Sequence, residues 1–205
     1  MSALESPRPY ASLLAKGEDR RQRILTVAER LLARNGWRAT SLAQIAKEAG
    51  VTPAGLLHHF ESKEQLLNAV LDARDADDDA HADYRSGDLI TELSRVPERF
   101  ARAPELVGTF TVLLAENIAP DAPLHDRMHK RYRAAVDIIA ELIKRGQSDG
   151  RYRQDFDAAN TAVEILAFIN GMETLWLLDP SIPLTEVFKG YAESLGHELA
   201  PRSAT

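Results

Sequence analysis

The chain has 205 residues, of which 44% are hydrophobic and 27% are charged, so it can bury the core of one large domain or of two small ones. Its net charge is −6 and it contains no cysteine, which excludes disulfides, a thiolate nucleophile and zinc held by cysteine. Residues 1–23 lack the apolar core of a signal peptide, and no uninterrupted apolar run approaches the roughly 18 residues of a membrane span. The sequence therefore predicts a soluble cytoplasmic protein with no membrane partner.

Positive charge is concentrated near the N-terminus. Residues 1–63 hold ten Lys or Arg and six Asp or Glu, a net charge of +4, which leaves −10 for the remainder. A basic first third beside an acidic body indicates that only one end meets a polyanion, although chance asymmetry gives the same pattern. Residues 1–17 contain Pro7, Pro9 and Gly17 and few apolar anchors, which predicts a flexible basic arm.

Three short helices are expected next. Apolar residues at helical spacing predict a first helix over residues 18–34, ended by Asn35-Gly36, and a second over residues 41–48. Gly50 then allows a tight turn, and Thr52 can cap a third helix that begins at Pro53. A short helix led by small residues can approach the floor of a DNA major groove, so this pattern is typical of a helix-turn-helix.

Several motifs of this region occur in a fixed order: TSLAQIA at residues 40–46, AGVT at 49–52, HF at 59–60 and SKE at 62–64. Together they resemble the N-terminal signature of the TetR (tetracycline-repressor) family of bacterial transcriptional regulators. The resemblance implies an all-α fold with a three-helix helix-turn-helix domain at residues 18–64. It also implies a larger helical domain at residues 65–205 that binds ligand and dimerises.

The resemblance places Ser41 and Lys63 near DNA phosphates and the front of the third helix toward the groove, while His59 is expected to be internal or bridging. With the cations at the start of the first helix, the expected DNA contacts are Arg20, Arg21, Thr40, Ser41, Thr52, Pro53, Ala54, Gly55, Leu57, His58 and Lys63. One position departs from the family pattern. Leu57 stands where the family usually has an aromatic residue, commonly a tyrosine that touches a phosphate, so this chain lacks the hydroxyl of that contact.

The remainder is predicted to be a helical body. The acidic stretch at residues 72–88 lacks the glycine and the spaced glutamate of a calcium-binding loop, so we expect a solvated helix face there. Residues 158–178 are apolar nearly all round, which predicts a helix buried against both its own core and a partner subunit. The expected dimer interface is Leu166, Ile169, Gly171, Phe188 and Tyr191.

Polar residues interrupt the apolar helices of this body, and a few polar groups in an apolar cavity can orient a small ligand. The expected effector site is Phe110, Leu113, Asn117, Tyr132, Asn170, Glu173, Thr174 and Trp176. The alternative, which the pattern supports equally, is that the polar groups bond to neighbouring helices or across the dimer.

Evidence for catalysis is weak. His125 and His129 have metal-ligand spacing, but they offer only two nitrogens, with Asp121 and Asp126 as the nearest further donors. The sequence shows no Ser/His/Asp set, phosphate-binding glycine loop or carboxylate pair. We therefore predict no enzyme activity, metal or cofactor.

The expected function is a ligand-responsive transcriptional regulator that binds a pseudo-palindromic operator as a homodimer and is released by a small, largely apolar effector. Repression rather than activation is inferred from the family alone. The alternative is a helical ligand-binding or adaptor protein that has lost specific DNA binding, which Leu57 and the acidic net charge support. A remoter alternative is a metal-dependent enzyme built on His125 and His129.

Overall fold

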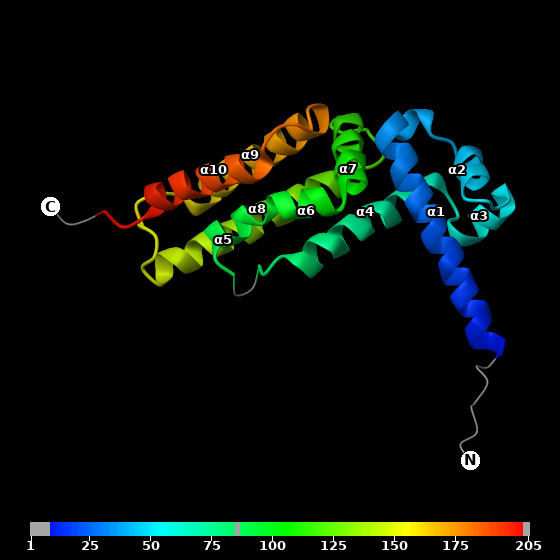
Figure 1. Ribbon diagram of the computed structural model, residues 1–205, viewed down its shortest axis with the longest axis horizontal. Coiled ribbons are helices and arrows are strands. Elements are labelled where there is room, and N and C mark those ends of the chain that lie inside the picture. Colours follow the sequence, from blue (N-terminus) through cyan, green and yellow to red (C-terminus); the bar gives the residue numbers. More distant parts are fainter. Residues whose placement is uncertain (1–8, 85–86, 203–205) are drawn as a thin grey trace, which may run out of the picture.

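The computed structural model describes residues 9–84 and 87–202, and within these ranges it contains ten helices and no strand (Figure 1). The expected all-α fold is confirmed. The helices are α1 Pro9–Ala39, α2 Leu42–Glu48, α3 Pro53–His59, α4 Lys63–His81, α5 Leu89–Ser94, α6 Val96–Arg102, α7 Pro104–Glu116, α8 His125–Ser148, α9 Ala158–Leu178 and α10 Leu184–Leu199.

The prediction of a flexible arm over residues 1–17 is wrong for residues 9–17, which form the start of α1. Proline is favourable at the first helical position, and residues 11–16 are mostly strong helix formers. Gly17 inside the helix costs about 1 kcal/mol relative to alanine, which its neighbours offset. Residues 1–8 of the predicted arm lie outside the described residues.

Helix α1 is broken at Gly36, near its predicted end. Gly36 has φ 74° and ψ 174°, a left-handed conformation that favours glycine. A Cβ at this position would also lie 2.8 Å from Oε1 of Glu116 on α7. The carboxylate of Glu116 instead accepts the backbone N–H of Trp37 at 2.5 Å and that of Arg38 at 3.5 Å. Gly36 therefore permits a direct joint between α7 and the end of α1.

The starts of α2, α3 and α4 are all capped by side chains, and the predicted cap at Thr52 is confirmed. Each helix follows a serine or threonine whose hydroxyl accepts the backbone N–H three residues later, at 3.0–3.1 Å. The three caps are Ser41, Thr52 and Ser62. Gly50, in the turn between α2 and α3, has φ 67°. These local interactions fix the angle at which α3 follows α2.

Two hydrophobic clusters form the interior. The first joins the apolar faces of α1 to α4 to Phe110 and Leu113 of α7 and to Met128 of α8. The second joins α5, α6 and α7 to the later turns of α8 and to α9 and α10. The first cluster thus extends across the predicted boundary at residues 64/65, because α7 packs along α1.

Helix α9 packs against α8 and α7, and the ring of Phe168 joins it to Phe188 and Tyr191 of α10. By length and composition alone α9 could cross a membrane, a property that it shares with core helices of soluble proteins. Its outer face carries three exposed apolar side chains, Val163, Leu175 and Leu178. A helix with both an inner and an outer apolar face is expected to meet a partner.

The packing of α1 against α7 brings two carboxylates together. The hydroxyl of Thr109 on α7 donates to the backbone carbonyl of Glu29 on α1 at 2.7 Å. The pKa of the Glu29 carboxyl is raised from 4.5 to about 7, first by burial and then by the negative charge of Glu105. Above about pH 7 the Glu29 carboxyl is therefore ionised at a place where burial and the charge of Glu105 disfavour its negative charge.

This placement predicts the effect of Glu29→Gln on stability. Because the folded state binds the Glu29 proton more tightly than the unfolded state, the free energy of unfolding falls as pH rises from 4.5 to about 7. Glutamine does not ionise, so the variant should be more stable than wild type above pH 7 and similar to it below pH 4.5. Thermal unfolding between pH 4.5 and 8 measures this, with exposed Glu186 on α10, as Glu186→Gln, for control. Wild-type and Glu29→Gln curves that stay parallel across this range would contradict the assignment.

Candidate DNA interface and effector cavity

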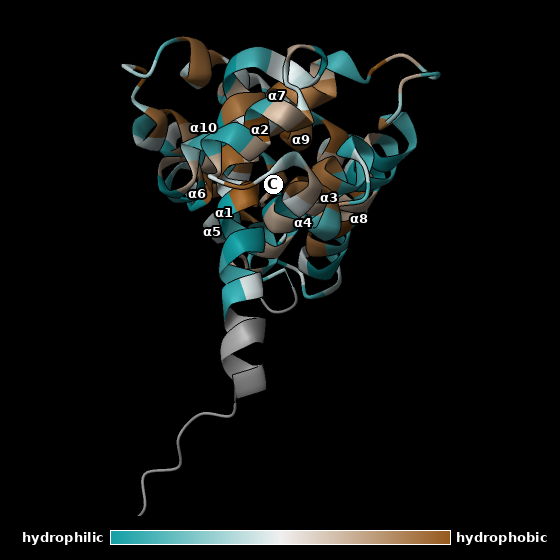
Figure 2. Ribbon diagram, turned by 90° about the vertical axis from the view of Figure 1, so that its right-hand side faces the viewer, coloured by the Kyte–Doolittle hydropathy of each residue, from teal (hydrophilic) through white to brown (hydrophobic). Residues whose placement is uncertain are grey.

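Helix α3 lies at one end of the molecule (Figure 1), the end that faces the viewer in Figure 2, and most of its outer residues are exposed. Leu56 and Phe60 hold it in place, since they are 0% and 1% exposed and lie in the first hydrophobic cluster. The expected DNA contacts Thr52, Pro53, Ala54, Leu57 and His58 are all exposed, and Gly55 is half-buried. The helix therefore offers a narrow outer face of small and apolar side chains with one histidine, a shape suited to a major groove.

Cations of α1 lie beside the C-terminal end of this helix. The guanidinium of Arg21 lies 5.2 Å from the centre of the Phe60 ring and 3.9 Å from the Glu18 carboxylate. The pKa of His59 is lowered by burial and by the positive charges of His58, Arg20 and Arg21. The structure thus brings Arg20 and Arg21 of α1 close to His58 and His59 at the C-terminal end of α3.

Two expected DNA contacts need correction. Thr40 is 1% exposed, and its hydroxyl donates to the carbonyls of Gly36 at 2.8 Å and of Leu31 at 3.3 Å. It is a structural residue that closes the break after α1, so its expected DNA contact is wrong. Lys63 is half-buried: its ammonium donates to the carbonyl of Trp37 and lies 3.8 Å from the centre of the Trp37 ring. Burial lowers the pKa of Lys63, and this lysine reaches a phosphate only if it leaves Trp37.

A cavity of about 520 Å³ lies in the body, between α4, α5, α6, α8 and α9. Four of the expected effector residues line it: Phe110, Tyr132, Asn170 and Glu173. Most of the remaining wall is apolar, formed by residues such as Val96, Ile138, Leu142 and Ile165. Its size and lining are those of a site for a small, largely apolar molecule.

The other four expected effector residues do not line this cavity. Leu113 is 0% exposed within the first hydrophobic cluster. The side chain of Asn117 donates to the carbonyl of Leu113 at 2.7 Å and accepts from the N–H of Leu124 at 3.1 Å, so it holds the loop before α8. The exposed Thr174 hydroxyl donates to the carbonyl of Asn170, and Trp176 packs against Phe100 with ring centres 6.2 Å apart. Trp176 therefore contacts Phe100 of the cavity wall and does not line the cavity itself. The hydrogen bonds of Asn117 and Thr174 to nearby backbone groups explain these two polar side chains.

Ion pairs that the sequence interpretation missed line part of the cavity wall. Arg74 of α4 pairs with Glu173 at 3.5 Å and with Asp78 at 3.3 Å. Arg131 of α8 pairs with Asp78 at 2.8 Å and also contacts Asp75. These pairs continue to Arg127, which lies 2.9 Å from Asp75 and 2.6 Å from Asp72.

This α4/α8 ion-pair network, comprising Asp72, Arg74, Asp75, Asp78, Arg127, Arg131 and Glu173, corrects the expectation of a solvated acidic face on α4. Glu173 has 4% side-chain exposure, and burial raises its pKa. The pKa of Arg131 is lowered to about 10 by burial and by the charge of Arg74. The four-residue spacing of Arg127 and Arg131, matched by that of Arg74 and Asp78, is the signal that could have predicted facing charged helices.

The residues expected at the dimer interface lie in different environments. Phe188 is 0% exposed inside the second cluster, so it cannot contact a partner without unfolding of α10, and that expectation is wrong. Leu166 and Ile169 face the cavity, and Tyr191 stacks on Phe168 at 3.7 Å between ring centres. Gly171 is exposed on the outer face of α9. The periodicity marks α9 as apolar but does not distinguish its cavity-facing side from its exposed side, and its role in a dimer stays a prediction.

The histidine pair on α8 has a structural explanation. The rings of His125 and His129 stack with centres 6.3 Å apart, and Nδ1 of His125 lies 3.3 Å from the carbonyl oxygen of Asn117. Within residues 9–84 and 87–202, no three His, Asp or Glu side chains are grouped so that they could hold a metal ion.

Comparison with known families agrees with this geometry. The family model "Bacterial regulatory proteins, tetR family" matches residues 24–70, and "BetI-type transcriptional repressor, C-terminal" matches residues 99–194. The chain is similar to the HTH-type transcriptional regulator TtgR of Pseudomonas putida, with 28% identity over 179 residues, 80% of this chain and 83% of TtgR.

Solved structures give the same result. A TetR-family transcriptional regulator from Rhodococcus sp. is 25% identical with a TM-score of 0.67, over 90% of this chain and 100% of that one. A transcriptional regulator from Saccharomonospora viridis, solved in complex with choline, is also 25% identical, with a TM-score of 0.69 over the same shares. The similarity includes both the helix-turn-helix and the body.

The environment of Thr40 predicts the result of Thr40→Val. Valine keeps the shape but leaves the carbonyls of Leu31 and Gly36 without their donor, so the free energy of unfolding should fall by about 1–2 kcal/mol. The folded variant should bind DNA with an unchanged dependence on salt. Urea unfolding and DNA titrations measure the two effects, and Thr185→Val, at an exposed threonine of α10 outside the candidate DNA interface, is the control. Weaker DNA binding with unchanged stability would instead make Thr40 a DNA contact.

Proposed function

Because this chain belongs to the TetR family of bacterial transcriptional regulators, we propose that it is a homodimeric repressor that releases a pseudo-palindromic operator when an effector enters the body. Family membership makes the protein a DNA-binding regulator and not an enzyme. The cytoplasm, where the operator lies, is its proposed location. The effector is a small and largely apolar molecule that occupies the cavity of about 520 Å³.

The observation that carries the proposal is the exposed face of α3 beside a positive group on α1. The small side chains of Pro53 and Ala54 let the backbone approach the bases, and Leu57, 46% exposed, offers an apolar contact of the kind made with thymine methyl groups. Arg20, Arg21 and His58 lie close enough to His59 to lower its pKa, and in the proposed complex they meet the flanking phosphates. Thr52 and Ser41 cap helices with their hydroxyls and remain exposed.

Dimerisation is supported by the outer face of α9. Val163, Gly171 and Leu175 are separated by multiples of four residues, so they share one side of the helix, and they are exposed. Pairing of two such faces would bury apolar area and would relate two α3 helices by a twofold axis. Operator binding then requires the two helices to enter successive major grooves, about 34–36 Å apart.

Helix α4 supports a route from the cavity to the DNA. It begins at Lys63 inside the helix-turn-helix core and ends beside the cavity, where it is tied to α8 and α9 by the ion-pair network. An effector releases DNA only if it binds better to a state in which the two α3 helices are wrongly spaced. A tilt of α4 changes that spacing, because α4 packs in the same core as α3.

The primary experiment is selection of bound fragments from random DNA by the purified protein, followed by sequencing. A pseudo-palindromic consensus with half-sites about one helical turn apart is expected. Binding that never exceeds that to competitor DNA would favour an adaptor protein without specific DNA recognition.

Ala54→Glu tests the DNA-binding face. Ala54 is exposed in the first turn of α3, where a carboxylate is compatible with the helix dipole, so stability should be unchanged. Repulsion from phosphates should weaken operator binding by roughly 100-fold or more, as measured by fluorescence anisotropy. Ala159→Glu is the matched control, because Ala159 is exposed at the equivalent second position of α9. Equal affinity of both variants for the operator would place the DNA interface elsewhere.

Gly171→Leu tests the dimer. A side chain at Gly171 meets no atom within 4 Å in the protomer, and leucine improves helix propensity by about 0.8 kcal/mol, so the protomer should be at least as stable. The added bulk should separate two apposed α9 helices, which sedimentation measures as a shift toward monomer with weaker operator binding. Gly17→Leu on α1, which is also unobstructed, is the control for the propensity change. A dimer that persists in Gly171→Leu would exclude close packing of this face.

A further inference from the structure

The charged groups of the cavity wall are concentrated where α4 meets the first half of α8. Arg74, Arg131, Tyr132 and Glu173 line this part, whereas Leu142 lies further along α8, and Glu92 of α5 and Arg99 of α6 also line the cavity. Tyr132 and Leu142 are ten residues apart on one helix, a separation of about 15 Å at 1.5 Å per residue. This spacing leaves room for an elongated molecule with one polar terminus near Tyr132.

The charges in this part of the cavity wall already have partners. Glu173 accepts from both Arg74 at 3.5 Å and the Thr111 hydroxyl at 3.4 Å, and Arg131 is shared between Asp75 and Asp78. The guanidiniums of Arg74 and Arg131 also lie 5.4 and 4.7 Å from the centre of the Phe110 ring. A ligand with a full charge would have to separate one of these pairs, which is costly in a buried site.

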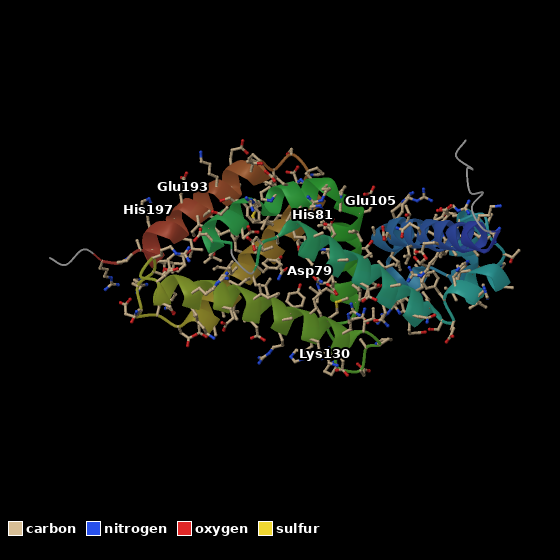
Figure 3. All side chains as sticks on the ribbon, turned by 90° about the horizontal axis from the view of Figure 1, so that it is seen from below. Asp79, His81, Glu105, Lys130, Glu193 and His197 are labelled. Atoms are coloured by element: carbon tan, nitrogen blue, oxygen red, sulfur yellow. The ribbon has the colours of Figure 1, made fainter. Side chains whose placement is uncertain are left out.

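The rim of the cavity carries charges of both signs, so it favours neither a cationic nor an anionic ligand. Lys130 on α8 and Asp79 on α4 are exposed on the two helices that face each other across the cavity (Figure 3). Arg99 of α6 is half-buried and donates to the hydroxyl of Tyr84 at 3.3 Å.

The hydroxyl of Tyr132 differs from these groups, because it is buried and has no hydrogen-bond partner within the described residues. Its ring is held beside that of Phe110, with centres 6.0 Å apart. Burial and the nearby Glu173 raise the pKa of Tyr132 to about 12, so the hydroxyl keeps its proton at neutral pH. A buried polar group without a partner is costly, and a ligand that supplies the partner recovers that cost.

We infer that the effector is an uncharged, elongated hydrophobic alcohol or phenol whose hydroxyl hydrogen-bonds to that of Tyr132 while its apolar part extends toward Leu142. This inference rests on the proposed role of the cavity as the effector site. It assigns Tyr132 as the residue that selects a neutral polar group, and it leaves the α4/α8 ion-pair network intact when the ligand is bound.

The test compares octan-1-ol, octanoate and octylammonium by isothermal titration calorimetry with the full-length protein. Octan-1-ol should bind most tightly. Tyr132→Phe should weaken octan-1-ol binding by about five- to tenfold, the size of one neutral hydrogen bond, without loss of stability. Tyr84→Phe is the matched control: it also removes a hydroxyl from the cavity wall, but one already bonded to Arg99, so octan-1-ol affinity should change less than about twofold.

Tighter binding of octanoate or octylammonium, absence of octan-1-ol binding, or an unchanged affinity in Tyr132→Phe would each overturn the inference. Operator release is measured in parallel, so that failure of the ligand assignment can be distinguished from failure of the proposed function. Octan-1-ol that binds through Tyr132 without releasing DNA would support the ligand class but contradict induction through this cavity. Release by a charged probe alone would support induction and contradict the ligand class.

Discussion

The carboxylate of Glu116 is the contact on which the arrangement of the two halves depends. It accepts the backbone N–H groups of Trp37 and Arg38 just after the break at Gly36. Lys63, at the start of α4, binds the carbonyl of Trp37 from the other side. The backbone N–H of Trp37 is thus held by α7 and its carbonyl by α4. The hydrophobic cluster that these helices share makes the joint stiff. A shift of either helix must therefore move the helix-turn-helix.

Local interactions explain what could be predicted from the sequence. Helix caps such as Ser41 and Thr52, the left-handed Gly50 and the inward face of Leu56 and Phe60 depend on neighbours within a few residues, so spacing alone identifies them. Pro9 shows the limit of this reasoning. A proline reads equally as a helix start or as part of an extended arm, and only the residues that follow it decide.

The site was predicted less completely, because its residues are selected by partners distant in sequence. Thr40 has the polarity of a DNA contact but bonds to carbonyls of α1, and Asn117 has the polarity of a pocket residue but holds a loop. Phe188 and Gly171 both lie on apolar helices, yet one is buried and the other exposed. Periodicity reports that a helix has an apolar face, whereas the identity of the opposing surface is a property of the tertiary structure.

The ion-pair network between α4 and α8 gives the molecule two electrostatic regimes. Exposed cations beside α3 compete with dissolved ions for phosphates, so their attraction to DNA decreases steeply with ionic strength. Pairs such as Arg131 with Asp78 have side chains only 19% and 21% exposed, and screening acts on them much less. Under the proposed function, a rise in salt would therefore weaken DNA binding while the body kept its shape, so that osmotic stress and an effector would act on DNA binding by separate physical routes.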